Sequence, residues 1–297
     1  MTDRWTIIAN PAAGRGRAAR GLDRAVAHLR AAGVTTDIHL TRGPGHAGEL
    51  AAAAAQRGVD RLIACGGDGT VTEMLPVAVE AGVTLGLLPL GTGNDLARAL
   101  GIPRGAAAGA RNLLEGQPSA IDVTLVNGHP CATVTSLGLD ADVSQAVRNR
   151  RLPCPGTAAY LVAALSCLRR FTPFRVGLTG DFGHVESKVL LVAGANTSSY
   201  GGGMRIAPGA DPRDGLLDLC VVRAVPRRQV VAFMPRLFWG GHLRHPAVTV
   251  LRSRRVDMEI LSGGERDIWA DGEPASRTPA TLEVLPRALR ILLPKRR

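Results

Sequence analysis

The sequence predicts a chain of the α/β plus β class: an N-terminal α/β domain with a parallel sheet, then a mainly antiparallel β-sandwich domain. Apolar segments of strand length alternate with helix-length segments up to about residue 121. Glycine-rich polar loops follow three of the expected strands in that part. From Asp122 onward the segments are shorter, richer in Val and Thr, and separated by turn sequences such as Asn127-Gly128 and Asp214-Gly215.

The first part should form a sheet covered by helices on both faces. Strands are expected at 5–9, 33–40, 62–65 and 83–89, and helices at 17–32, 44–57, 70–80 and in a stretch ending near Leu114. Ligands of such parallel sheets bind beyond the carboxyl ends of the strands, where the three glycine loops fall. We therefore expect any small-molecule site of this part at that edge.

The second part should consist of short strands with two helical interruptions. Strands are expected at 123–126, 131–136, 174–178, 185–194 and 217–222, with two more short strands around Pro286 in 281–293. Helices are expected at 156–170 and 227–239. The domain boundary is placed at residues 121 and 122, where the pattern changes.

The loop from Gly66 to Thr70 has the composition of an anion site. It follows a short apolar strand and precedes a helix, and it reads Gly-Gly-Asp-Gly-Thr. Glycines allow backbone conformations that other residues avoid and let a ligand approach the main chain. The start of the following helix favours an anion, and the carboxylate of Asp68 suits a phosphate that arrives with a divalent cation. A tight strand-to-helix turn without a ligand is the alternative.

Composition narrows the class of protein and of partner. The net charge of +11 comes almost entirely from arginine and points to nucleic acid, nucleotide or an anionic membrane surface as partner. The longest apolar runs are too short to span a bilayer, and no signal pattern is visible at the start, so a cytoplasmic protein is expected. The five scattered cysteines include no Cys-x-x-Cys pair, which predicts buried free thiols at Cys65, Cys131, Cys154, Cys167 and Cys220.

An ordered set of motifs gives the chain a family resemblance. The motifs are Asn10-Pro-Ala-Ala-Gly14, Gly66-Gly-Asp-Gly-Thr70, Gly91-Thr-Gly-Asn-Asp-Leu-Ala-Arg98, Ile121-Asp-Val123, Ser136-Leu-Gly-Leu-Asp140, Gly201-Gly-Gly-Met204, Asp211-Pro-Arg-Asp-Gly-Leu216 and Asp271-Gly-Glu273. With these, the sequence resembles the soluble diacylglycerol kinase catalytic-domain family of bacterial lipid kinases, which are relatives of sphingosine and ceramide kinases. The resemblance covers essentially the whole chain.

The resemblance implies transfer of the γ-phosphoryl group of ATP to a lipid hydroxyl. The substrate expected first is diacylglycerol, which would give phosphatidic acid. Residues 1–121, joined by 279–297 returning from the C-terminus, would bind nucleotide, and 122–278 would bind the lipid, with the reaction in the cleft between them. A sphingoid base or another lipid is the alternative substrate. A nicotinamide dinucleotide kinase, which shares Gly-Gly-Asp-Gly-Thr, and a nucleic-acid-binding protein are more distant alternatives; nucleic acid is not expected as partner.

The resemblance also assigns roles to residues. Asp68 would hold a catalytic Mg²⁺ through water, Asp95 and Asp122 would support that network, and Glu273 would be the general base, with Asp271 beside it. The nucleotide-binding set would be Asn10, Gly14, Arg15, Gly66, Gly67, Asp68, Gly69, Thr70, Gly91, Thr92, Asn94 and Asp95. Alternatives drawn from the residues alone are a helix cap for Asp95, an inter-domain hydrogen bond for Asp122, and a plain surface turn for Asp-Gly-Glu.

A second Mg²⁺ is expected at Asp211, Asp214 and the backbone carbonyl of Leu216, which relatives use as a structural site; an ordinary Asp-Gly turn is the alternative. Two positions depart from the family pattern. Thr72 stands where Asn is usual, and Arg15 stands where Lys is common, although a guanidinium can still bind phosphate.

Arginines interleaved with aromatic residues suggest a peripheral dock on an anionic membrane, the alternative being a solvated basic face over buried aromatics. This stretch holds Arg223, Arg227, Arg228, Arg236, Arg244, Arg252, Arg254 and Arg255, with Phe233, Phe238 and Trp239. A homodimer formed through edge strands of the β domain is left open.

Overall fold

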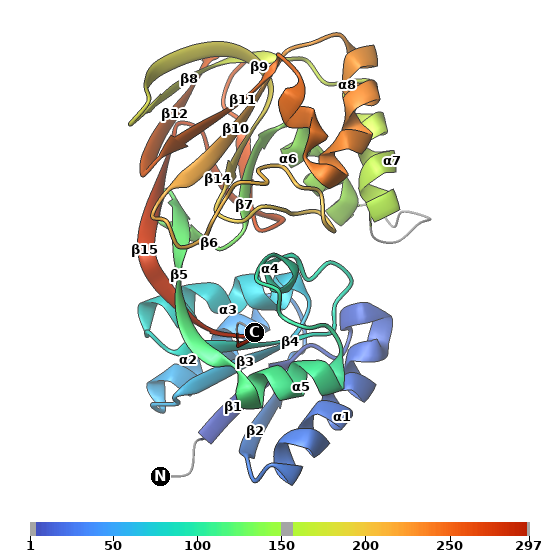
Figure 1. Ribbon diagram of the computed structural model, residues 1–297, viewed down its shortest axis with the longest axis vertical. Coiled ribbons are helices and arrows are strands. Elements are labelled where there is room, and N and C mark those ends of the chain that lie inside the picture. The colour runs from blue at the N-terminus through green and yellow to red at the C-terminus, as the bar shows by residue number, and fades with distance from the viewer. Residues whose placement is uncertain (1–3, 150–156, 296–297) are drawn as a thin grey trace. The chain divides into compact units, whose positions relative to one another are not determined.

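A computed structural model describes residues 4–149 and 157–295 of the chain (Figure 1). The chain divides into two compact units, Met1–Ile121 with Arg287–Arg297, and Asp122–Pro286. Each unit has its own hydrophobic core.

The first unit is built on a parallel sheet, as predicted. Its strands β1 (Arg4–Ala9), β2 (Thr35–Leu40), β3 (Arg61–Gly66) and β4 (Thr84–Pro89) lie in the order β2-β1-β3-β4. The helices are α1 (Arg17–Ala31), α2 (His46–Gln56), α3 (Asp68–Glu80), α4 (Asp95–Ala99) and α5 (Ala106–Glu115). Five of the six residues of β3 are buried, which explains its continuous apolar sequence.

Two pairs of helices pack against this sheet, α1 with α5 and α2 with α3. Successive side chains of a strand point to opposite faces. Ile7, Ile63 and Leu88 share one face and pack in a single core with Leu29 of α1 and Leu113 of α5. The sheet is therefore covered in the way that the alternating sequence pattern predicts, and its strands direct their carboxyl ends to one edge.

The second unit is an antiparallel β domain with helices. Strand β9 (Gly183–Ala195) is central and pairs with β7 (Val134–Gly138), β8 (Phe174–Gly180) and β10 (Leu217–Arg223). The other strands of this unit are β6 (His129–Cys131), β11 (Val248–Ser253), β12 (Arg255–Ser262), β13 (Asp267–Ala270) and β14 (Glu273–Arg277). Two long strands, β5 (Gln117–Val126) and β15 (Ala280–Leu293), have residues in both units. The α-helices of this unit are α6 (Leu139–Asn149), α7 (Thr157–Leu168) and α8 (Arg227–Phe233), and its short 3-10 helices are η2 (Met234–Trp239) and η3 (Gly241–Arg244). The first unit also has one 3-10 helix, η1 (Ala13–Gly16).

Two expected strand patterns were wrong. Residues 281–293 form one strand, β15, and not two, because a local irregularity with φ 56° at Arg287 accommodates Pro286 without ending the strand. The expected strand 131–136 is divided between β6 and β7. It is interrupted because the N–H groups of Ala132 and Thr133 donate to the carboxylate of Asp271, at 2.8 and 2.7 Å, and not to a neighbouring strand.

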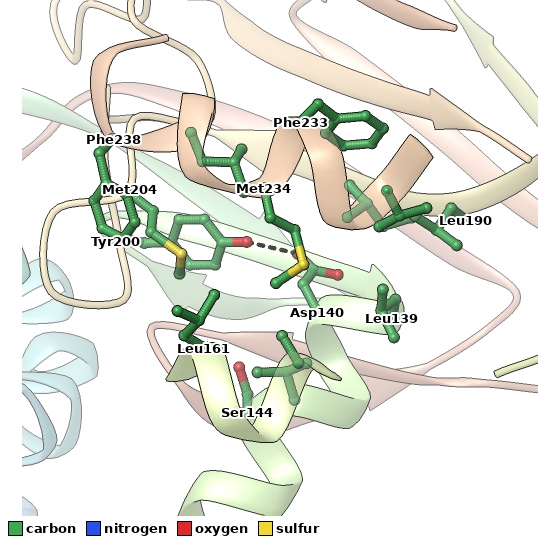
Figure 2. A pocket seen from close by; sticks show the side chains of 15 residues that line it. Leu139, Asp140, Ser144, Leu161, Leu190, Tyr200, Met204, Phe233, Met234 and Phe238 are labelled. Carbon is green, nitrogen blue, oxygen red and sulfur yellow. Dashed lines mark hydrogen bonds between the residues drawn. The ribbon is translucent and has the colours of Figure 1, made fainter. Parts of the chain in front are cut away.

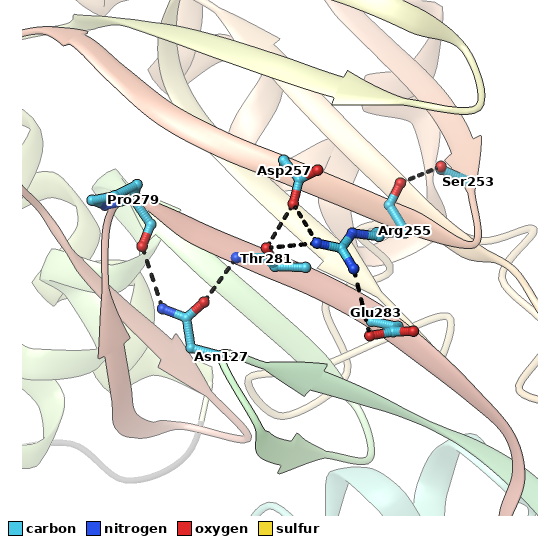
Figure 3. Close-up of polar contacts among 7 residues, drawn as sticks. All are labelled: Asn127, Ser253, Arg255, Asp257, Pro279, Thr281 and Glu283. Atoms are coloured by element: carbon cyan, nitrogen blue, oxygen red, sulfur yellow. Dashed lines mark hydrogen bonds and ion pairs between the residues drawn. The ribbon is translucent and has the colours of Figure 1, made fainter.

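A cluster of polar side chains fixes β12 against β15 (Figure 3). Asp257 accepts hydrogen bonds from the Thr281 hydroxyl at 2.6 Å and from Arg255 at 3.3 Å. The side-chain oxygen of Asn127 accepts the Thr281 N–H at 2.8 Å. The Thr281 hydroxyl, by donating to the carboxylate, holds the pKa of Asp257 below its usual value.

The cysteines of the described residues carry free thiols, as expected. Cys65, Cys131 and Cys220 are buried and Cys167 is partly buried, whereas Cys154 lies outside the described residues. Among residues 4–149 and 157–295, none of the helices has both the length and the apolar character that crossing a membrane requires.

Candidate active site

Two of the glycine loops of the first unit are joined through Asp68. Its carboxylate accepts the N–H of Asn94 at 2.7 Å and the N–H of Asp95 at 2.5 Å. The N–H of Gly91 in turn donates to the Gly66 carbonyl at 2.8 Å. The loop that follows β3 and the loop that follows β4 therefore form one rigid structure. Asp95 begins α4, and the capping position before it belongs to Asn94.

The glycines of these loops are required for close packing. A Cβ on Gly91 would lie 2.4 Å from the Cα of Gly67, and a Cβ on Gly66 would lie 2.4 Å from the Thr70 hydroxyl. The expectation that this stretch uses backbone conformations special to glycine was wrong, because none of Gly66, Gly67 and Gly69 has a positive φ. Glycine lets two loops touch here.

A cavity of about 470 Å³ opens beside the joined loops. Its lining contains seven of the predicted nucleotide-binding residues, namely Asn10, Gly14, Gly67, Gly69, Thr70, Gly91 and Thr92. The other five, Arg15, Gly66, Asp68, Asn94 and Asp95, do not line it. Helix α3 begins at this cavity, so its positive dipole end favours an anion there.

Residues that the sequence did not single out complete the cavity. The segment 41–44 after β2 forms part of the wall, and so does Glu73 on α3. The Glu73 carboxylate accepts the N–H groups of Gly45 at 2.8 Å and Ala47 at 3.0 Å, and thereby caps the start of α2. Because these partners lie 26 and 28 residues away, no local sequence pattern could have revealed the contact.

The carboxylates beside Gly93 fit a hard cation. A Cβ on Gly93 would lie 2.5 Å from Oδ2 of Asp68 and 3.8 Å from Oδ2 of Asp95, so both carboxylates flank this glycine. Arg98 lies 3.9 Å from the Asp95 carboxylate. Carboxylate oxygens are the ligands that Mg²⁺ prefers. In the part of the chain that the structure describes, no group of three or more acidic, histidine or cysteine side chains forms a ready-made metal site, so water would have to complete the coordination.

Asp122 is buried at the start of the second unit, and three of its hydrogen bonds join it to residues of that unit. Its carboxylate accepts the Gly215 N–H at 2.8 Å, and its own N–H donates to the Pro212 carbonyl at 2.7 Å. Its carbonyl accepts from Asn196 at 2.8 Å. Asp122 thus holds the turn that carries the expected second metal site.

At that turn, the Asp214 carboxylate already has protein partners. One oxygen accepts the Leu216 N–H at 3.0 Å, and the other forms an ion pair with Arg252. Arg252 also lies 3.5 Å from Asp218, whose pKa is raised by burial despite this guanidinium. A cation bound by Asp211 and Asp214 would therefore compete with Arg252.

Glu273 is presented by a tight hairpin between β13 and β14. Asp271 and Gly272 form its two-residue turn, both with positive φ, at 52° and 80°. The Asp271 carboxylate accepts the Thr133 hydroxyl at 2.5 Å in addition to its two backbone donors. Glu273 itself is partly exposed and forms an ion pair with Arg148 of α6. Asp271 therefore anchors the hairpin, while Glu273 carries the accessible carboxylate.

The second unit also contains an apolar pocket of about 70 Å³ (Figure 2). Helices α6, α7, α8 and η2 line it together with β9 and the segment around Tyr200. Apart from Asp140, Ser144 and Tyr200, its lining is apolar: Leu139, Val143, Leu161, Ala164, Leu190, Leu191, Met204, Val230, Phe233, Met234, Leu237 and Phe238. The sequence motif containing Asp140 was noted, but neither α6 nor this pocket was predicted.

Large apolar side chains are exposed on the helices around this pocket. They are Leu161, Val162 and Leu165 of α7, Val231 of α8, and Trp239 of η2, which is 64 % exposed. Of the aromatic residues expected at a membrane dock, Phe233 is buried, Phe238 lines the pocket and Trp239 is exposed. The exposed apolar surface thus belongs mainly to α7 and η2.

Comparison with known families gives two adjoining matches. Residues 4–126 match the diacylglycerol kinase catalytic domain, and residues 133–293 match the YegS C-terminal NAD kinase beta sandwich-like domain. Together the two matches cover nearly the whole chain.

Individual relatives agree with these matches. A diacylglycerol kinase of Mycobacterium tuberculosis is 34 % identical over 98 % of this chain and 95 % of its own length. A diacylglycerol kinase of Bacillus subtilis is 28 % identical over 98 % of this chain and 97 % of its own length. A Bacillus anthracis structure described as a candidate diacylglycerol kinase superposes with a TM-score of 0.82 at 26 % identity, over 99 % of this chain and 98 % of the other.

Proposed function

Because the chain belongs to the diacylglycerol kinase and YegS family of lipid kinases, we propose that it transfers the γ-phosphoryl group of ATP to a lipid hydroxyl. Diacylglycerol, which would give phosphatidic acid, is the substrate to test first; a sphingoid base or another hydroxyl lipid is the alternative. The observation that supports the proposal most is the cavity at the two joined glycine loops. Family membership favours a lipid kinase over a nicotinamide dinucleotide kinase or a nucleic-acid-binding protein.

The nucleotide would bind in this cavity of the first unit. Its phosphates would lie against the backbone of Gly67, Gly69 and Thr70 at the start of α3, with Thr92 on the facing loop. Asn94 and Asp95 would contribute indirectly, because their N–H groups hold Asp68. Arg15, which does not line the cavity, would have to turn toward it to bind phosphate.

Asp68, with Asp95 beside it, would hold Mg²⁺ through water. A bound Mg²⁺ neutralises charge on the phosphate oxygens during transfer. The protein's own contribution is to hold the Asp68 carboxylate in one position. The two N–H groups of Asn94 and Asp95 that donate to it do this.

Glu273 would act as general base on the lipid. It would accept the hydroxyl proton while the lipid oxygen forms a bond to the γ-phosphorus and the bond from that phosphorus to the departing ADP oxygen breaks. The ion pair with Arg148 holds the carboxylate in place but also occupies it, so Arg148 would have to move away from Glu273 in the productive state. Asp122 and Asp271 would act by positioning the turn and the hairpin to which they are bonded.

The second unit would bind the lipid in the apolar pocket and contact the membrane from the cytoplasmic side. Segments 143–180 and 219–256, which contain α7, α8 and η2, have many arginines and no acidic residue. An anionic membrane surface attracts each such arginine by about 1 kcal/mol. Substituting serine for Leu165 and Trp239 should weaken sedimentation with anionic vesicles, and unchanged sedimentation would refute this contact.

A structural Mg²⁺ at Asp211, Asp214 and Leu216 is part of the same proposal. Because Arg252 pairs with Asp214, Arg252→Gln should strengthen the response of unfolding to added Mg²⁺. If neither the parent protein nor this variant is stabilised by Mg²⁺, the site is an ordinary turn.

Phosphoryl transfer from ATP to diacylglycerol in mixed micelles tests the reaction. The parent protein should form phosphatidic acid in the presence of Mg²⁺, and Asp68→Ala and Glu273→Gln should each lose at least ~100-fold in rate. Glu259→Gln, at an exposed position of β12, is the matched control and should keep full activity. Failure of the parent protein to bind ATP would refute the proposal, and ATP binding without any lipid product across a lipid panel would refute the acceptor class.

A further inference from the structure

Asp140 is a buried carboxyl group for which the proposed phosphoryl transfer has no use. Gly138, with φ 101°, ends β7, and α6 begins at the next residue, so Asp140 lies in the first turn of that helix. Its side chain borders the apolar pocket, and the Tyr200 hydroxyl donates to it at 3.2 Å (Figure 2). Burying a carboxyl in apolar surroundings costs free energy unless hydrogen bonds or a charge partner compensate the loss of water.

The contacts around Asp140 only partly compensate its burial. One oxygen accepts the Ala141 N–H at 3.0 Å, and the hydrogen bond from Tyr200 is long for a bond between two oxygens. Burial raises the pKa of Asp140 to about 7, although hydrogen bonds from Ser136, Tyr200 and the backbone act in the other direction. The neighbouring Cys220 thiol has its pKa raised to about 12 by burial and by Asp140, so it stays neutral.

An apolar chain entering the pocket would remove the remaining water from this carboxyl. Loss of water disfavours the ionised form further, so the neutral acid becomes the stable form in the occupied pocket. A neutral carboxyl carries one O–H donor. The hydroxyls of Ser136 and Tyr200 adjoin Asp140, and nearly all of the pocket lining is apolar, so a carbonyl oxygen of a ligand would be a further acceptor for this donor.

We propose that Asp140 and Tyr200 form the polar end of an acyl-lipid site, where the neutral Asp140 carboxyl donates a hydrogen bond to an ester carbonyl oxygen of an acylglycerol. The inference rests on the proposed lipid kinase function and narrows its substrate class to lipids with an ester near the phosphorylated hydroxyl. The described cavity of about 70 Å³ accommodates a short part of one chain. The remainder would lie along the exposed apolar residues of α7, such as Leu165.

Substrate chemistry distinguishes this site from an apolar pocket that forms no hydrogen bond with the lipid. A dialkylglycerol has the same hydroxyl and the same chains as a diacylglycerol but lacks the carbonyl oxygens. A site built to hydrogen-bond a substrate group discriminates strongly against an analogue without that group, because its own polar group is left unpaired. A lipid ammonium group, in contrast, would require the ionised carboxylate and would reverse the dependence on pH.

The experiment compares diacylglycerol with dialkylglycerol of equal chain length, at about pH 6 and about pH 8.5, as the ratio of kcat/KM values. Comparing the two lipids cancels any pH dependence of the transfer step itself, because both lipids present the same hydroxyl to Glu273. The parent protein should prefer the ester by about tenfold or more at the lower pH and lose much of this preference at the higher pH. Asp140→Asn, which keeps a donor at every pH, should retain the preference at both, and Asp140→Leu should abolish it.

Several results would overturn the inference. Equal use of ester and ether lipids by the parent protein would refute it while leaving the kinase proposal intact. So would an ester preference that is the same in Asp140→Leu as in the parent, or a preference for amine-bearing lipids that Asp140→Asn removes. Absence of product from every lipid would refute the kinase proposal itself. Asp257→Asn, at an exposed position of β12, is the control and should leave the ratio unchanged.

Discussion

The stability of the second unit should depend on pH through Asp140. Its pKa is raised by burial from 3.8 to about 7 in the folded chain, so the folded state binds a proton more tightly than the unfolded state does. Between these two values the folded protein holds more protons, and its free energy of unfolding falls as pH rises. Asp140→Asn removes this titration, so the variant should gain stability relative to the parent as pH increases.

The size of the effect follows from the shift. Each unit of pKa difference corresponds to about 1.4 kcal/mol, so the ionised Asp140 costs the fold about 4 kcal/mol at pH values well above 7. At about pH 5 the cost is about 2 kcal/mol, because the unfolded carboxyl is ionised there and the folded one is not. The advantage of Asp140→Asn should therefore grow by about 2 kcal/mol between pH 5 and pH 8.

Urea unfolding at several pH values measures this difference. Trp269 is buried in the second unit and Trp5 in the first, so a Trp5→Phe background makes fluorescence report on the second unit. Asp257→Asn is a control of opposite sign. The pKa of Asp257 is lowered by the Thr281 hydroxyl, so its charge stabilises the fold above its unfolded pKa and that stabilisation is lost in acid. If the free energies of unfolding of Asp140→Asn and the parent differ by the same amount at every pH between 5 and 8, the prediction that burial raises the pKa of Asp140 is refuted.

Two further predictions concern the first unit. Glu73→Gln should lower the free energy of unfolding of this unit by about 1–2 kcal/mol, because the two N–H groups at the start of α2 lose a charged acceptor. Urea unfolding measures this loss. Glu115→Gln, at an exposed position, is the control and should leave the free energy of unfolding unchanged. Gly91→Ala should weaken ATP binding at least ~10-fold in calorimetry, because the added methyl group would overlap the backbone of Gly67 and separate the two loops. Gly209→Ala, where the space around the Cβ position is open, is the control. Equal ATP affinity of the two variants would contradict the packing argument.

The sequence predicted the parts of the fold that depend on short-range patterns. The buried strand at 62–65 and the helix after Thr70 were found because apolar runs and glycine loops are local features. Seven of the residues that the family resemblance assigns to nucleotide binding line one cavity of the structure. The parallel sheet that brings them to one edge followed from the alternation of strands and helices.

What the sequence did not predict depends on contacts between distant residues. Asp68 binds N–H groups 26 and 27 residues away, and Asp271 binds those of a segment 138 residues away. The interruption of the expected strand 131–136 follows from the second of these contacts. Helix α6 was not predicted, since the sequence analysis gave no secondary structure to the stretch after Ser136, and the pocket at Asp140 was therefore not predicted either.

The carboxylates of this chain divide into two kinds by the groups that meet them. Asp68, Glu73, Asp122 and Asp271 each accept N–H groups from backbone outside their own immediate turn, and these hydrogen bonds fix them in place. Asp140 accepts only the N–H of the adjacent Ala141 from the backbone, borders an apolar pocket, and has its pKa raised by burial. Removing a carboxylate of the first kind disconnects a loop or hairpin, so activity lost in Asp68→Ala or Asp271→Ala has a structural cause as well as a chemical one. The two causes separate when unfolding is measured beside activity, because a purely catalytic carboxylate, as proposed for Glu273, leaves the free energy of unfolding nearly unchanged when it is replaced by an amide.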